Sequence, residues 1–147
     1  MVSVAMAAQD KTLRVDYIFT GTDKSSEICL DEMSCFDGWA GRRHNLDSVA
    51  LRGNGQICMK DAVSGKVLYR QSFSTLFQEW QATEEATRVR KSFENVFLLP
   101  MPETKVELKV ELYGFTGGVS ACKWDRLSTD ARRHSGRARR ALFGNTR

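Results

Sequence analysis

The chain has 147 residues, enough for one domain with a single core, and its 41% apolar and 27% charged residues are typical of a globular protein. The net charge of +4 is uneven: residues 1–113 carry fourteen basic and sixteen acidic residues, and residues 114–147 carry eight basic and two acidic ones. The slightly acidic body argues against a nucleic-acid-binding surface, and no apolar run is long enough to span a membrane.

Residues 1–11 are expected to be a leader outside the fold. The small residues Ala5, Ala7 and Ala8 around Met6 follow the pattern that precedes a signal-peptide cleavage site, but the stretch lacks the basic and apolar regions of a whole signal. Two interpretations stay open: the remnant of a secretory signal, or a disordered terminus without information. The first predicts a secreted, periplasmic or cell-envelope protein.

Seven stretches show the alternation or the β-propensity of a strand, with turn residues between them. The most regular one has Val106, Leu108, Val110 and Leu112 alternating with charged residues. Short strands with little helix predict an all-β fold, an antiparallel sandwich of two facing sheets spanning residues 12–113. The seven expected strands are residues 12–20, 26–33, 47–52, 55–62, 66–73, 93–99 and 104–113.

The central feature is a predicted hairpin within residues 53–80. Its arms, GQICMKDA and KVLYRQSF, both alternate, and Val63-Ser64-Gly65 joins them. Glycine permits the positive φ that a tight turn needs.

The hairpin is followed by a stretch near residues 75–90 that breaks the β pattern. It is rich in helix formers, and Ser74 could cap a short helical turn with Phe77 and Trp80 on one face. The alternative is an irregular crossover between the two sheets. An aromatic set is expected to fill the core: Tyr17, Phe19, Tyr69, Phe73, Phe77, Trp80, Phe93 and Phe97.

Residues that could carry catalysis or bind a metal are sparse. The chain has none of the H-E-x-x-H, G-x-S-x-G and G-x-x-x-x-G-K motifs, and its only histidines are His44 and His134. Its four cysteines form no C-x-x-C pair. We therefore predict no catalytic residue, no metal site and no cofactor in this chain. Cys29 and Cys35 are close enough in sequence to suggest a disulfide in an oxidising compartment, but free buried thiols are favoured.

The loop that follows residue 38 holds the candidate contact residues Trp39, Arg42, Arg43 and His44. Guanidinium groups bind carboxylates and other anions with two parallel hydrogen bonds, which suggests a ligand or an interdomain contact. An arginine stacked on Trp39 for packing is an equal alternative. His44 has no nucleophile near it in sequence, so we interpret it as a surface histidine.

Four segments in order give the chain a family resemblance: LRVDYIFTG, WAGRRHNLD, GNGQICMKDAVSGKVLYRQSFSTLFQEWQATEEA and KSFENVFLLPMPETKVELKVEL. Together they resemble the N-terminal domain of the IgA-peptidase family of zinc metallopeptidases of Bacteroides-type gut bacteria, over roughly residues 12–113. The resemblance implies an immunoglobulin-like β-sandwich that precedes a separate catalytic domain, in a secreted or envelope-directed enzyme.

The resemblance also implies where the chemistry lies. Family members carry their zinc site, with an H-E-x-x-H helix, in the catalytic domain that follows, so no catalytic residue is carried over to this chain and zinc is expected only in that domain. Charge, periodicity and resemblance all change near Gly114. For residues 114–147 we therefore favour a frameshifted end of a longer gene over a disordered terminus or a basic arm.

The sequence thus predicts a non-catalytic accessory domain, present as a fragment of a secreted IgA-type metallopeptidase. Its expected partners are the catalytic domain and a protein or glycoprotein substrate. The alternative is a free-standing module that binds a peptide or glycan through the loop from Trp39 to Asn45.

Overall fold

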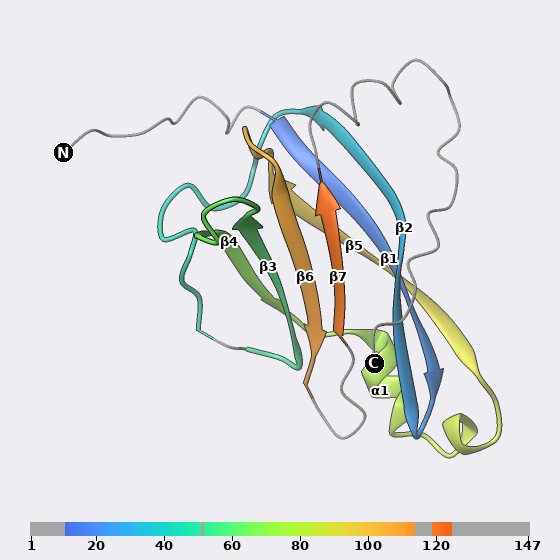
Figure 1. Cartoon of the computed structure of the whole chain (residues 1–147). Helices are drawn as coiled ribbons and strands as arrows, with labels where there is room; N and C mark the ends of the chain where they lie inside the picture. The colour runs from blue at the N-terminus through green and yellow to red at the C-terminus, as the bar shows by residue number, and fades with distance from the viewer. Residues whose placement is uncertain (1–10, 51, 114–118, 125–147) are drawn as a thin grey trace.

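The computed structural model describes residues 11–50, 52–113 and 119–124. Its strands form two antiparallel sheets that pack face to face, a three-stranded sheet with the order β2-β1-β5 and a four-stranded sheet with the order β4-β3-β6-β7 (Figure 1). The expected all-β sandwich is therefore confirmed. One short α-helix, α1, lies at one end of the two sheets (Figure 1).

The three-stranded sheet is built around β1 (Lys11–Thr22), which pairs with β2 (Ser25–Asp37) on one side and with β5 (Lys91–Pro100) on the other. Alternate side chains of β1 point into the core and are completely buried, at Leu13, Val15, Tyr17 and Phe19. Each such burial contributes about 1.5–3 kcal/mol, so β1 anchors this sheet.

A β-bulge in β2 explains why this strand is longer than the expected residues 26–33. The pairing with β1 shifts between Asp16 and Tyr17, so that Asp31 is the extra residue. Apolar side chains are even-numbered before the bulge, at Ile28 and Leu30, and odd-numbered after it, at Met33. The change of phase ends the alternation in the sequence but not the strand.

The four-stranded sheet contains the predicted hairpin, with β3 (Gly55–Asp61) paired to β4 (Val67–Phe73). Asp61 accepts hydrogen bonds from the main-chain N–H groups of Val63 and Ser64, and Gly65 has a φ of 71°. The Asx turn and the glycine together set the direction in which the chain returns.

The same sheet is completed by β6 (Val106–Leu112), which pairs with β3, and by β7 (Val119–Trp124), which pairs with β6. Six of the seven expected strands are thus present, and the expected strand at residues 47–52 is wrong. The described part of that segment, up to residue 50 and at residue 52, belongs to the connection between β2 and β3.

Strand β7 lies within residues 114–147, the part expected to be a frameshifted or disordered basic tail, and it pairs with β6 at residues 119–124. The sheet therefore extends past residue 113. Residues 1–10, 51, 114–118 and 125–147 lie outside the described part. The rest of the expected tail lies there, and so does the expected leader except Lys11, which begins β1.

The expected crossover between the sheets contains two short helices, α1 (Leu76–Gln81) and the 3₁₀ helix η2 (Glu85–Thr87). The N-cap is Thr75 rather than Ser74, because the Thr75 hydroxyl accepts a hydrogen bond from the N–H of Gln78. Phe77 and Trp80 lie buried on the inner face of α1, as expected.

Aromatic rings join the two sheets. The rings of Phe73 on β4 and Phe97 on β5 are 4.7 Å apart, and Phe19 on β1 lies 6.1 Å from Phe73. The whole expected aromatic set belongs to this core or packs against it.

The strand order differs from that of a constant-type immunoglobulin domain. There the first, second, fourth and fifth strands share one sheet. Here β4 lies in the sheet of β3, and β1 rather than β2 is the central strand. The sandwich is therefore clear, and the immunoglobulin-like part of the expectation rests on the family resemblance alone.

The cysteines of β2 cannot form the suggested disulfide with each other. Cys29 and Cys35 lie on the same strand, six residues apart, whereas a disulfide needs Cα atoms within about 7 Å and a strand rises about 3.3 Å per residue. Both are free; Cys29 is exposed and Cys35 is half-buried, whereas Cys58 is free and buried as expected.

Candidate functional site

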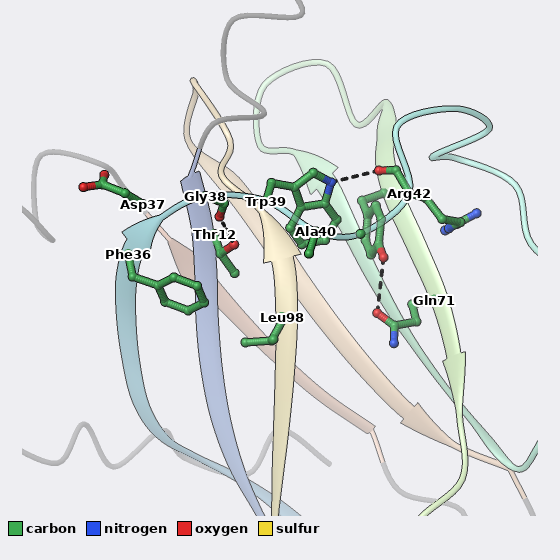
Figure 2. A pocket seen from close by; sticks show the side chains of 11 residues that line it. Thr12, Phe36, Asp37, Gly38, Trp39, Ala40, Arg42, Gln71 and Leu98 are labelled. Carbon is green, nitrogen blue, oxygen red and sulfur yellow. Dashed lines mark hydrogen bonds between the residues drawn. The ribbon is translucent and has the colours of Figure 1, made fainter.

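An open cleft of about 850 Å³ lies on the side of the sandwich where β4 and β5 form the outer strands of their sheets. Its lining comes from the end of β2, residues 38–42 of the loop that follows, and single positions on β1, β4 and β5. Figure 2 shows Leu98 of β5 below Trp39, and Gln71 of β4 to the right of both. The cleft therefore spans the seam between the two sheets.

The walls of the cleft are mostly apolar and aromatic. The Trp39 ring is 9% exposed and lies edge-on to the Tyr69 ring, with centroids 6.0 Å apart. Phe36 and Leu98 are 43% and 46% exposed, which is unusual for large apolar side chains that belong to strands. Such a surface suits apolar or aromatic groups of a ligand.

Arg42 holds the loop against the sandwich. Its guanidinium donates to the main-chain carbonyls of Asn45 (2.8 Å), Ser48 (3.0 Å) and Arg70, and it lies over the Tyr69 ring, 5.1 Å from the centroid. A guanidinium has five N–H donors, and at least three are used within the protein. The group therefore acts first as a structural clamp.

Hydrogen bonds also join Trp39 and Arg43 to the loop. The Trp39 indole N–H donates to the carbonyl of Arg42 at 2.9 Å, and Arg43 donates to the carbonyl of Trp39 at 3.1 Å. His44 is exposed. Of the four candidate residues, Trp39 and Arg42 line the cleft, whereas Arg43 and His44 are not part of its lining. The suggested stacking partner of Arg42 is Tyr69 rather than Trp39.

The same loop covers the outer edge of β4. The N–H of Arg70 donates to the carbonyl of Leu46 at 2.8 Å, and the carbonyl of Arg70 accepts from Arg42. The Ser72 hydroxyl donates to the carbonyl of Ala50 at 3.3 Å. Loop carbonyls and the Arg42 guanidinium thus satisfy groups of an edge strand without forming a ladder.

The sequence reasoning missed the contribution of the strands to the cleft, above all Phe36 and Leu98. The signal for Leu98 was present: residues 96–99, Val-Phe-Leu-Leu, are apolar without interruption, whereas a strand with one wet face alternates. Val96 and Leu98 are the outward-facing members of this run, 47% and 46% exposed.

The chemistry of the cleft favours binding. Its charged lining consists of Arg42 and of Asp37, whose carboxylate lies 3.7 Å from the ammonium group of Lys11. No group of three or more His, Cys, Asp or Glu residues that could hold a metal lies in the described part of the chain. Nor does that part contain a helix long and apolar enough to cross a membrane.

Comparison with known proteins gives one family. The sequence model of the family described as Peptidase M64 N-terminus matches residues 5–122, which include β1 to β6 completely and β7 as far as residue 122. No curated protein matches the chain. The match covers well over half of the chain and both sheets of the sandwich except the end of β7, and the chain therefore belongs to the Peptidase M64 N-terminus family.

Proposed function

We propose that this chain is the non-catalytic accessory domain of a secreted IgA-type zinc metallopeptidase and that it contributes a binding surface rather than chemistry. The family match over residues 5–122 carries the proposal. The cleft supports it, because its walls present Phe36, Trp39 and Leu98, and its two charged side chains bind groups of the protein itself. Zinc and the catalytic residues would belong to the peptidase domain of the enzyme.

The domain would act in one of two ways: it packs against the peptidase domain, or it positions a protein or glycoprotein substrate for it. A free-standing module that binds a peptide or glycan is the second candidate, favoured by the aromatic walls of the cleft, since aromatic faces bind both kinds of ligand. Both candidates place the contact at the cleft.

A peptidase assay tests the first part of the proposal. The purified chain, with zinc added, is expected to leave a protein substrate uncut, with no difference between zinc and a chelator. Cleavage that zinc supports and a chelator abolishes would overturn the proposal.

A second experiment tests the accessory role. The peptidase domain of a family member is prepared with and without this domain in front of it. Packing predicts a lower melting temperature for the peptidase domain alone, and substrate positioning predicts a raised KM at an unchanged kcat. If the temperature, KM and kcat are all unchanged, the free-standing module is the better description.

Export is a further part of the proposal, and it rests on the small residues Ala5, Ala7 and Ala8. Fractionation of the producing cell tests it. The protein is expected outside the cytoplasm, and a purely cytoplasmic protein would contradict the proposal.

A further inference from the structure

One hydrogen bond determines which residues of β5 direct their main-chain N–H and C=O groups toward the free edge of the strand. The N–H of Met101 donates to the carbonyl of Lys11 at 3.0 Å, so these residues form a hydrogen-bonded pair, and the β1–β5 register continues without a shift as far as Lys91. Hydrogen-bonded and non-hydrogen-bonded pairs alternate in an antiparallel ladder. The odd-numbered residues of β5 therefore bond to β1, and the even-numbered residues direct their main-chain groups outward.

The outward groups belong to Glu94, Val96 and Leu98, and no main-chain hydrogen bond within the described residues reaches them. The side chains of the same three residues are exposed. Each of these positions thus offers an N–H, a C=O and a side chain to the same incoming strand. This combination is what strand addition requires, because main-chain bonds give affinity and alternate side chains give specificity.

The other three edges of the sandwich differ from the edge of β5. The loop around Arg42 and Leu46 covers β4 at Arg70. Strands β2 and β7, at the opposite side, lie next to each other (Figure 1). Proteins usually protect exposed edges with charges, proline or a covering segment, whereas the edge of β5 has the apolar Val96 and Leu98 between Glu94 and Pro100.

The charges near the edge of β5 indicate which kind of segment would bind there. Glu94 is exposed, and no ion pair in the described residues neutralises it. The neighbouring row of the sheet, Val96–Asp16–Glu32, adds two carboxylates on the same outer face, of which Asp16 pairs with Arg14. The outer face around Glu94 and Val96 thus carries carboxylates, whereas Lys91 at the start of β5 is paired with Glu85. The edge positions that follow Glu94, Val96 and Leu98, are apolar.

We propose that the free edge of β5 binds an extended peptide segment as an added antiparallel strand, with apolar residues opposite Leu98 and Val96 and a lysine or arginine opposite Glu94. Read from its N-terminus, the segment has the pattern apolar-x-apolar-x-basic. Side chains at the x positions point toward the seam, where the cleft beside Trp39 and Gln71 provides space. The proposal rests on the binding role proposed above and specifies its partner.

The test uses the full chain and the fluorescein-labelled peptide Ser-Val-Thr-Val-Thr-Lys-Thr-amide, with binding followed by fluorescence anisotropy. Saturable binding with a Kd below about 1 mM is expected, which is modest because one short strand contributes little more than its main-chain bonds. Absence of saturation at that concentration would overturn the proposal.

Charge exchange locates the peptide. Glu94→Lys is expected to weaken binding about tenfold, and a peptide with glutamate in place of lysine should regain it in the variant. Glu107→Lys on β6 of the other sheet is the matched control and should change Kd less than about twofold. Equal effects of the two substitutions would contradict a site at β5.

Methylation of the peptide nitrogens tests the strand geometry. N-methylation of the two valines removes N–H groups that would bond to β5 and is expected to reduce affinity more than about tenfold, whereas N-methylation of the first two threonines alters N–H groups that point away. Equal losses of affinity would overturn strand addition.

Sedimentation of the chain alone tests whether a second copy of the chain occupies the edge. A dimer that Glu94→Lys dissociates would mean that a second copy, rather than a peptide, is the occupant. None of these measurements depends on peptidase activity, so failure here leaves the accessory role to its own tests.

Discussion

Strands β4 and β5 lie on the same side of the sandwich, yet their outer edges differ in whether other groups of the protein bond to them. At β4, both main-chain groups of Arg70 bond to the loop of Arg42 and Leu46. At β5, the outward groups of Val96 and Leu98 have no such cover within the described residues. The cover at β4 consists of one long cationic side chain and loop backbone, and within the described residues no such group bonds to the outer edge of β5.

The largest decrease in stability is expected for Trp39→Ala, which removes the ring that supports the loop covering the edge of β4. Trp39 packs on Tyr69 and bonds to the carbonyl of Arg42, so its loss removes a buried ring and loosens the loop. A decrease of about 3–5 kcal/mol in the free energy of unfolding is expected from urea titration. A loss below about 1 kcal/mol would mean that the loop does not depend on this ring.

Arg42→Ala should destabilise by about 1.5–3 kcal/mol, because three main-chain carbonyls lose a charged donor. Urea titration again measures it. Arg42→Lys keeps the charge but not the planar fork, so most of the loss should remain. Arg43→Ala is the matched control, since Arg43 is exposed and its bond to Trp39 is farther from the edge of β4. Equal effects at Arg42 and Arg43 would argue against the clamp.

A smaller effect, visible in acid, is expected at the turn that leads into β4. Hydrogen bonds from the Ser64 N–H and then from the Thr104 and Ser64 hydroxyls lower the pKa of Asp61 to about 2, from the ordinary value of 3.8. Because the folded pKa is the lower one, this stabilisation is complete above about pH 4 and disappears as the pH falls toward 2. Asp61→Asn should remove that part of the acid dependence, as measured by thermal melts between pH 5 and 2. An unchanged profile would exclude Asp61 as its source.

The smallest effect is expected on the open edge. Val96→Thr and Leu98→Thr should each change the free energy of unfolding by less than about 0.5 kcal/mol, because both side chains are nearly half exposed in the isolated chain. Thermal or urea melts measure the change. A loss of 2 kcal/mol or more would mean that another part of the chain covers this edge, and the contrast between β4 and β5 would fail.

Elements whose pattern is complete within the strand could be predicted from the sequence. Val106 and Leu108 alternate with charges along β6, and the Val63-Ser64-Gly65 turn determines its own hairpin. The segment at residues 47–52 could not be predicted correctly, because short apolar alternation is equally compatible with an extended loop whose hydrogen bonds go to the edge of β4. The missed β7 is six residues long and lies between glycine-rich and arginine-rich stretches, so its pairing with β6 has no local signal.

The candidate site could be predicted only in part, because its contacts also depend on how distant segments pair. The loop residues Trp39 and Arg42 attract attention as isolated aromatic and charged groups. Two features depend on which strands become neighbours: Arg42 donates a hydrogen bond to the carbonyl of Arg70, and Leu98 lines the same cleft as Trp39. Contacts of this kind are set by the sheet order, which residue types alone do not determine.

The bond from Met101 to Lys11 has a consequence for the rate at which β5 exchanges its amide hydrogens. Since it fixes which N–H groups face β1, deuterium uptake along β5 should alternate with a period of two residues. The amides of Glu94, Val96 and Leu98 should exchange within seconds to minutes, and those of Asn95 and Phe97 should be as slow as the core of β1. The register that this hydrogen bond sets at the end of the strand thus determines which amides of β5 bond to β1 and which are open to solvent.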